Sequence, residues 1–212
     1  VHKTVGFLTD SEVGLAYAEV GDGTFYRVQD GMPQYRATDG GFQPIPRADG
    51  VLLLSDIKLR SKPLARNAGA SLWDIGDGVA CLEFHTKMNA LDPDIVAMIG
   101  RAIAMGKKGA FKALVIHNEG ENFSVGANIG LALFAANIAA WGEIEGMIEG
   151  GQKAMHALRA APFPVVGAPS GMALGGGCEV LLHCDAVQAH AESYIGLVEV
   201  GVGLIPGWGG CP

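Results

Sequence analysis

The sequence predicts an α/β domain over residues 69–212, preceded by a β-rich appendage over residues 1–68 that we interpret as the end of a preceding domain. Up to about Asn67, short strand-like pieces alternate with hairpin-type turns. From Gly69 onward, short apolar runs alternate with segments of helical periodicity. That alternation is typical of a parallel sheet covered by helices.

The appendage is predicted to consist of strands that follow one another through tight turns. Asp30-Gly31 and Asp49-Gly50 are turn dipeptides, because both residue types tolerate the backbone angles that such turns need. The strand-like segments beside these turns are residues 24–28, 34–37 and 51–54.

A β-α-β unit is expected over residues 79–117. Residues 79–84 and 113–117 are short apolar runs of the kind found in buried strands. Between them, Asp92 is a suitable helix N-cap and Pro93 fits the first helical position. The expected helix has a basic end before Gly109, formed by Lys107 and Lys108. Its apolar face is formed by Ile95, Met98, Ile99, Ala102 and Ile103.

The remaining pattern continues the same alternation. The apolar stretch 129–141, with Phe134 and Trp141, is expected to be core or a pocket wall. The chain stops at Pro212 on a loop-like segment, so we expect the 69–212 domain to be incomplete at its C-terminus. Helices are predicted over residues 143–161 and 178–184, and strands over residues 164–168, 186–190 and 194–197.

Composition favours a globular protein without nucleic-acid or membrane partners. The chain is 49% hydrophobic and 17% charged, with a net charge of −7, which gives no general attraction for nucleic acid or an anionic membrane. The uncharged run 160–178 contains Pro162, Pro164 and Pro169, which a lipid-facing helix would not tolerate. The N-terminus lacks the apolar core of a signal peptide, so a cytoplasmic location is expected.

The cysteines predict neither disulfides nor a metal site. Cys81, Cys178, Cys184 and Cys211 have no CxxC spacing, and we interpret them as free thiols, mostly buried. His183 lies next to Cys184, but adjacent helical residues point in different directions, so a structural role is favoured over metal binding.

Two glutamates are the candidate catalytic residues. Glu179 follows the glycine run 175–177, and Glu199 precedes the glycine-rich segment 201–210. Glycine leaves backbone N–H groups unshielded, so a substrate can approach them closely. Two carboxylates in such surroundings could divide general-acid and general-base work, and the N–H groups of the Gly126-Ala127 step and of residues 175–177 could form an oxyanion hole.

The chain from about Ser71 onward resembles the crotonase (enoyl-CoA hydratase/isomerase) superfamily. The matching segments are residues 87–91, 123–129, 171–179 and Glu199 with residues 203–210, in the family's order and spacing. Asn128 and Ser170 depart from the family's usual residues. The resemblance implies a ClpP/crotonase-like spiral of β-β-α units behind the N-terminal β-rich appendage.

The resemblance also implies a role for each matching residue. The N–H groups of Ala127 and Gly176 would hold a thioester oxygen, and Glu179 and Glu199 would be the catalytic carboxylates. The substrate would be an acyl-CoA, with no metal or redox cofactor, and family members form homotrimers or larger assemblies. The coenzyme A and substrate site would be formed by Lys87, Asn89, Ala90, Leu91, Gly126, Ala127, Asn128, Ile129, Gly175 and Gly176.

Having both glutamates favours an enoyl-CoA hydratase, which adds water reversibly to a trans-2-enoyl-CoA in fatty-acid β-oxidation. Two alternatives remain open. In a Δ3,Δ2-enoyl-CoA isomerase, Glu199 alone would move the proton. In a multifunctional β-oxidation protein, the segment could instead serve as a non-catalytic scaffold.

The appendage is similar to the junction in bacterial fusion proteins in which a 3-hydroxyacyl-CoA dehydrogenase precedes the hydratase. The chain itself contains no strand–GxGxxG–helix unit, so NAD would bind only to a domain outside it. A chain ending at Pro212 is expected to bind acyl-CoA more weakly than the full-length protein and not to form the trimer.

Overall fold

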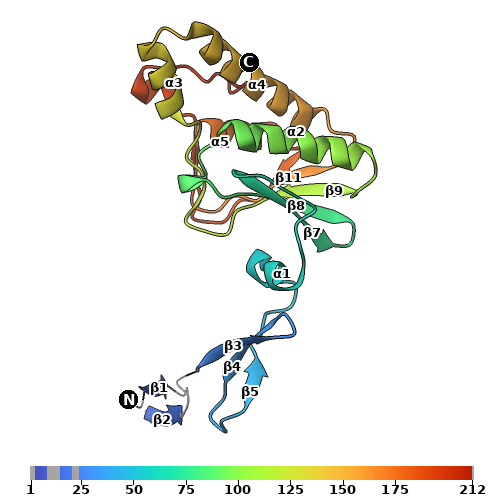
Figure 1. The fold of residues 1–212 in the computed structure, drawn as a ribbon, viewed down its shortest axis with the longest axis vertical. Coiled ribbons are helices and arrows are strands. Elements are labelled where there is room, and N and C mark those ends of the chain that lie inside the picture. Colours follow the sequence, from blue (N-terminus) through green and yellow to red (C-terminus); the bar gives the residue numbers. More distant parts are fainter. Residues whose placement is uncertain (1–2, 9–14, 21–23, 212) are drawn as a thin grey trace. The chain divides into compact units, whose positions relative to one another are not determined.

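The computed structural model describes residues 3–8, 15–20 and 24–211. The chain divides into two compact units, Val1–Ser61 and Lys62–Pro212. Figure 1 colours the chain from blue at its N-terminus to red at its C-terminus, so the first unit is blue to cyan.

The first unit contains antiparallel strands and one helix. The pair β3–β4 turns at Asp30-Gly31, where both residues have positive φ (53° and 71°), as a two-residue hairpin turn requires. Its elements are β1 (Lys3–Leu8) paired with β2 (Leu15–Val20), then β3 (Tyr26–Gln29), β4 (Met32–Arg36), β5 (Phe42–Pro44) and α1 (Leu54–Arg60).

The strand expected over residues 51–54 is wrong. Residues 51–53 belong to no strand, and Leu54 begins α1. Leu54 and Ile57 are buried at helical i, i+3 spacing, while Asp56 lies in the first turn and Arg60 in the last. In the apolar run that suggested a strand, Leu54 is buried, whereas Val51 and Leu52 are 51% and 50% exposed. A short apolar run does not distinguish a strand from the start of a helix.

The second unit contains a sheet with the order β13-β11-β9-β8-β7-β6 in its described residues. The strands β8, β9, β11 and β13 pair in parallel, while β7 joins β8 as an antiparallel hairpin. The strands are β6 (Ala65–Arg66), β7 (Ala70–Gly76), β8 (Val79–Phe84), β9 (Ala113–Ile116), β11 (Val165–Gly167) and β13 (Ala186–Val187).

The expected β-α-β unit is confirmed. The helix α2 (Pro93–Lys107) connects β8 to β9, and Asp92 Oδ1 accepts a hydrogen bond from Ile95 N at 2.9 Å, as an N-cap does. The whole predicted apolar face is buried (Ile95, Met98, Ile99, Ala102 and Ile103). Figure 1 shows α2 lying over the sheet beside α4 (Trp141–Arg159), and this layer forms the main core.

A smaller parallel sheet carries the site. Its order is β10-β12-β14, and a short helix, α5, follows β12 directly. The elements are β10 (Asn122–Ser124), β12 (Met172–Leu174), β14 (Tyr194–Gly196), α5 (Gly176–Leu182), and the 3₁₀ helices η1 (Lys87–Asn89) and η2 (Glu199–Val202). The helix α5 thus starts two residues before the expected Cys178, at Gly176.

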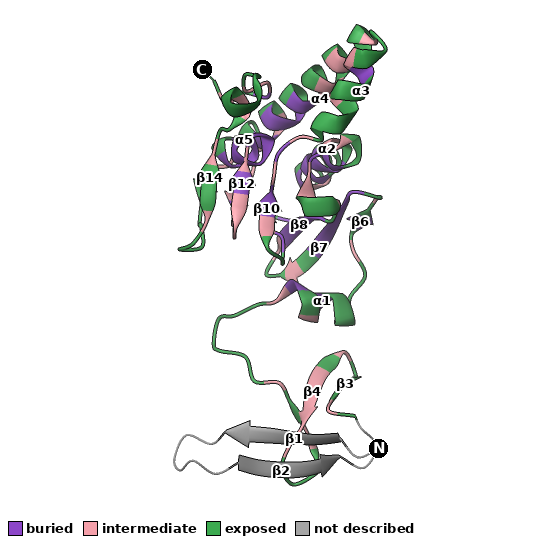
Figure 2. Cartoon of the chain, turned by 90° about the vertical axis from the view of Figure 1, so that its left-hand side faces the viewer, coloured by how far each residue is buried: buried purple, intermediate pink, exposed green. Residues whose placement is uncertain are grey.

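The expectation of a buried 129–141 stretch is mostly wrong. The helix α3 (Ile129–Asn137) buries Ala135, whereas Phe134 is 66% and Trp141 64% exposed. Figure 2 shows α3 mostly in the colour of exposed residues, unlike α2 and α5. The stretch is apolar on all sides, so its composition carried no information on which side faces the core. Leu131 does line a cavity, together with residues of α2 and α4.

Candidate active site

Two loops from distant parts of the sequence are tied together at the site. Leu91 N donates to Gly126 O at 2.8 Å, and Asn128 N donates to Leu91 O at 3.0 Å. Asn89 Nδ2 also donates to Asn122 O at 2.8 Å, just before the second loop. The segment expected to bind coenzyme A therefore runs along the loop that carries Ala127.

The N–H groups of Ala127 and Gly176 are neighbours. A Cβ placed on Gly176 would lie 3.3 Å from Ala127 N. Gly175, just before it, has φ 54° and ψ −122°, a conformation that favours glycine, and this turn presents the Gly176 N–H at the start of α5. Within the described residues, neither N–H donates a hydrogen bond to the protein. These two N–H groups, which we refer to as the oxyanion pair, can therefore bind one oxygen of a substrate.

Glu179 is held from one side. It is buried (2% exposed), and its Oε1 accepts hydrogen bonds from Trp208 N at 2.8 Å and Gly210 N at 2.9 Å. Its backbone oxygen accepts a further bond from His183 Nδ1 at 2.7 Å, so this ring nitrogen carries the proton. We refer to Trp208 N, Gly210 N and Glu179 Oε1 as the Glu179 clamp. The clamp fixes one carboxylate oxygen and leaves the other to contact a ligand.

Glu199 lies beside the turn at Gly175. A Cβ on Gly175 would lie 3.3 Å from Glu199 Oε1. Glu199 Oε2 is fully buried and has no hydrogen-bond partner among the described residues. A buried polar group without a partner costs about 1–3 kcal/mol, and such costs are concentrated where a ligand supplies the missing partner.

Cys178 marks the closeness of the two carboxylates. Burial raises the pKa of its thiol, and the charges of Glu199 and Glu179 raise that pKa further, in that order. Both carboxylates therefore act on one sulfur atom. Because the raised pKa keeps the thiol protonated at neutral pH, Cys178 is unsuited to nucleophilic attack.

A cavity of about 350 Å³ opens beside Ala127. It lies between α2, α3 and α4, and its lining is mostly apolar. Leu91, Ala127 and Trp208 line it next to the oxyanion pair, and the other walls come from Asp92, Pro93, Val96, Ala97, Leu131, Glu143, Gly146, Met147 and Gly150. We refer to it as the α2–α4 cavity.

The structure brings most of the predicted site residues together. Gly126, Ala127, Asn128, Gly175 and Gly176 surround the oxyanion pair, and both glutamates lie beside it. Lys87, Asn89, Ala90 and Leu91 follow along the adjoining loop. Ile129 begins α3 and is 42% exposed.

Sequence reasoning missed Trp208 as a site residue. Its place in the glycine-rich segment 201–210, next to Glu199, was the available signal. Within the residues that the structure describes, no group of His, Cys, Asp and Glu side chains has the arrangement of a metal site.

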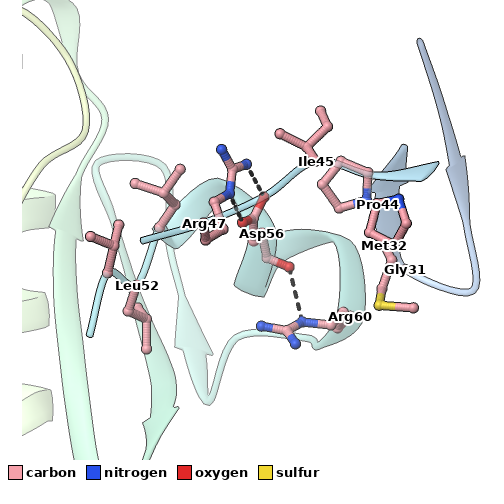
Figure 3. A pocket seen from close by; sticks show the side chains of 11 residues that line it. Gly31, Met32, Pro44, Ile45, Arg47, Leu52, Asp56 and Arg60 are labelled. Carbon is pink, nitrogen blue, oxygen red and sulfur yellow. Dashed lines mark hydrogen bonds and ion pairs between the residues drawn. The ribbon is translucent and has the colours of Figure 1, made fainter. Parts of the chain in front are cut away.

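A further cavity of about 280 Å³ lies in the first unit (Figure 3). Arg47 forms a two-point ion pair with Asp56 at 2.9 and 3.0 Å, and Arg60 Nε donates to Asp56 O at 3.3 Å. Apolar residues such as Met32 and Leu52 form other walls. None of the predicted site residues lines this cavity.

The enoyl-CoA hydratase/isomerase family model matches residues 74–212. The chain belongs to this family. Members of the enoyl-CoA hydratase/isomerase (crotonase) family are enzymes that act on acyl-CoA substrates. The resemblance and the α/β crotonase-like fold predicted from the sequence are confirmed.

Individual relatives support the assignment. A protein named "Probable 3-hydroxyacyl-CoA dehydrogenase" from Bacillus subtilis (strain 168) is 41% identical over 190 residues, which are 90% of this chain and 24% of the relative. The chain therefore spans about a quarter of that relative's length.

Two solved structures share the fold of this crotonase-family chain. An enoyl-CoA hydratase from Polaromonas sp. JS666 is 28% identical, with a TM-score of 0.60 over 65% of this chain and 54% of that chain. DspI from Pseudomonas aeruginosa is also 28% identical, with a TM-score of 0.60 over 68% of this chain and 55% of that chain.

In the part of the chain that the structure describes, no helix has both the length and the apolar character of a membrane span.

Proposed function

We propose that this crotonase-family chain is an enoyl-CoA hydratase, which adds water reversibly to a trans-2-enoyl-CoA to give a 3-hydroxyacyl-CoA. The observation that supports this choice is the presence of two carboxylates beside the oxyanion pair. Glu179 is fixed through one oxygen, and Glu199 presents a buried oxygen without a partner. Hydration needs a base for the water and an acid for the substrate carbon, and two carboxylates supply both.

Substrate binding follows from the arrangement of the loops. The thioester oxygen would accept hydrogen bonds from the N–H groups of Ala127 and Gly176. The coenzyme A moiety would lie along Lys87, Asn89, Ala90 and Leu91. The acyl chain would enter the α2–α4 cavity, because its apolar walls begin at Ala127.

In the chemical step, the water oxygen forms a bond to C3 of the enoyl group while one carboxylate takes the water's proton. The electron pair of the C2–C3 double bond moves toward the thioester, whose oxygen gains negative charge against the two N–H groups. The second glutamate, which enters the step as a protonated carboxylic acid, then delivers its proton to C2 and is left as a carboxylate. We assign Glu179 to the water and Glu199 to C2. Each backbone N–H donor of the oxyanion pair would stabilise the negative charge on the thioester oxygen by about 2.7–4 kcal/mol.

Other aspects of the function are proposed from the family and from the Bacillus subtilis relative's name. We propose a role in fatty-acid β-oxidation beside a 3-hydroxyacyl-CoA dehydrogenase domain, which would bind NAD. A cytoplasmic location and a homotrimer or larger assembly remain predictions.

The test is hydration of crotonyl-CoA by the purified full-length protein, followed as loss of the enoyl-thioester absorbance. Loss of absorbance with formation of 3-hydroxybutanoyl-CoA is expected. If absorbance does not fall but a 3-enoyl-CoA is converted to the 2-enoyl isomer, the isomerase function is correct instead. If neither reaction occurs while acyl-CoA binds, the chain is a non-catalytic segment.

A further inference from the structure

The side chain of Trp208 is packed where two helices approach the site. It is 8% exposed, and a Cβ on Gly151 of α4 would overlap with its indole ring. On the site side, a Cβ on Gly176 would lie 3.2 Å from its Cζ3. Gln152 Nε2 donates to Gly207 O at 2.9 Å and so fastens the preceding residue to α4. The ring therefore occupies one defined place between α4 and the oxyanion pair.

The same residue lines the α2–α4 cavity. Trp208 forms its wall together with Leu91 and Ala127, and Gly150 of α4 continues that wall. The oxyanion pair fixes the thioester end of a bound acyl group beside this wall. The indole ring therefore bounds the space for the acyl group, because a closely packed side chain is not easily displaced.

The backbone of Trp208 also belongs to the Glu179 clamp, through the 2.8 Å bond from its N–H to Glu179 Oε1. Trp208 is thus a single residue that touches the acyl cavity with its ring and a candidate catalytic carboxylate with its backbone. A side-chain substitution leaves the N–H in place, so the two contacts can be separated experimentally.

We propose that Trp208 is the specificity-determining residue for the acyl chain: its ring limits the α2–α4 cavity and so favours short acyl groups over long ones. This proposal rests on the assignment of the site to acyl-CoA thioesters, but not on hydration being the reaction. Replacing the ring by a methyl group adds apolar space that a longer alkyl chain can fill. Each further methylene buried strengthens binding about fourfold.

The experiment compares binding of butanoyl-CoA and dodecanoyl-CoA by calorimetric titration of the full-length protein. The variants are Trp208→Ala and Trp208→Phe, with Trp141→Ala as the matched control, because Trp141 is 64% exposed and lies outside the cavity lining. Thermal unfolding of each variant checks that it is folded. Trp208→Phe keeps an aromatic ring and provides a folded variant of intermediate size.

In Trp208→Ala, the ratio of the dodecanoyl-CoA Kd to the butanoyl-CoA Kd is expected to fall by about tenfold or more, since two to three extra methylenes become buried. Trp208→Phe should fall between Trp208→Ala and the wild type, and Trp141→Ala should match the wild type. An unchanged ratio in folded Trp208→Ala and Trp208→Phe would overturn the proposal. Absence of crotonyl-CoA hydration alongside a shifted ratio would instead overturn only the proposed reaction.

Discussion

At the residue scale, the two candidate catalytic glutamates are held in different ways. Glu179 has one oxygen bound by two backbone N–H groups, while Glu199 has a buried oxygen without a partner among the described residues. The first arrangement fixes the orientation of the carboxylate, and the second leaves a buried oxygen that a bound ligand can contact. Both fit acid–base chemistry that depends on position.

Glu179→Gln and Glu199→Gln are each expected to lower the hydratase kcat by roughly 10²–10⁴, as loss of a general acid–base group does. The amide keeps the size of the carboxylate but does not exchange a proton with water or substrate. The measurement is kcat with crotonyl-CoA, together with the thermal midpoint to show that the fold is kept.

Glu192→Gln is the matched control, since Glu192 is an exposed glutamate in the connection between β13 and β14. Its kcat should equal that of the wild type. A Glu179 or Glu199 variant that keeps kcat within about threefold of the wild type would remove that residue from the proposed mechanism.

At the element scale, α2 supports the site because Leu91 and Asp92 connect the loop that carries Ala127 to the first turn of this helix. Asp92→Ala removes the N-cap and is expected to lower the free energy of unfolding by about 1 kcal/mol. Asp94→Ala is the control, because Asp94 is exposed in the same turn and is not the cap. Urea unfolding of both variants gives the difference, and equal losses would contradict a specific capping role.

Some elements could be predicted from the sequence because their signals are local. The helix α2 has a cap, an N-terminal proline and a periodic apolar face, and β8 is a short apolar run after a glycine turn. The strands β10 and β12 were not predicted. Each has three residues in glycine-containing loops, and their pairing depends on partners far away in sequence.

The site was predictable to the extent that it lies in glycine-rich motifs. Glu179 and Ala127 stand beside such motifs, so their neighbourhood was visible before the fold was known. The position of Trp208 was not visible, because its partner Gly151 is an ordinary helix residue in sequence. The side of α3 that faces the core could not be predicted either, since a helix that is apolar all round has no polar face to indicate its orientation.

At the whole-molecule scale, the two units differ in the size of their cores. In residues 24–61 the buried side chains are Leu54 and Ile57, whereas the second unit has an extensive core around α2 and the larger sheet. Local stability follows buried apolar contact, so the two units should not open with the same free energy.

Hydrogen exchange measures this difference directly. Amides of β3, β4 and β5 are expected to exchange about a hundredfold or more faster than those of β8, β9 and α2, because their openings expose little apolar surface. Peptide-level mass spectrometry after timed labelling gives both sets in one sample. Equal protection would mean that the first unit is stabilised by more than its own core.

The fit of the Trp208 ring on Gly151 also constrains how this chain can diverge. A Cβ at residue 151 has no room while the indole is present, so a change there becomes tolerable only after the ring has become smaller. That order first opens a cavity and then fills it. Substitutions at residues 151 and 208 are therefore coupled. Residues larger than glycine at position 151 are accessible to a chain that has already lost Trp208, but not to one that keeps it.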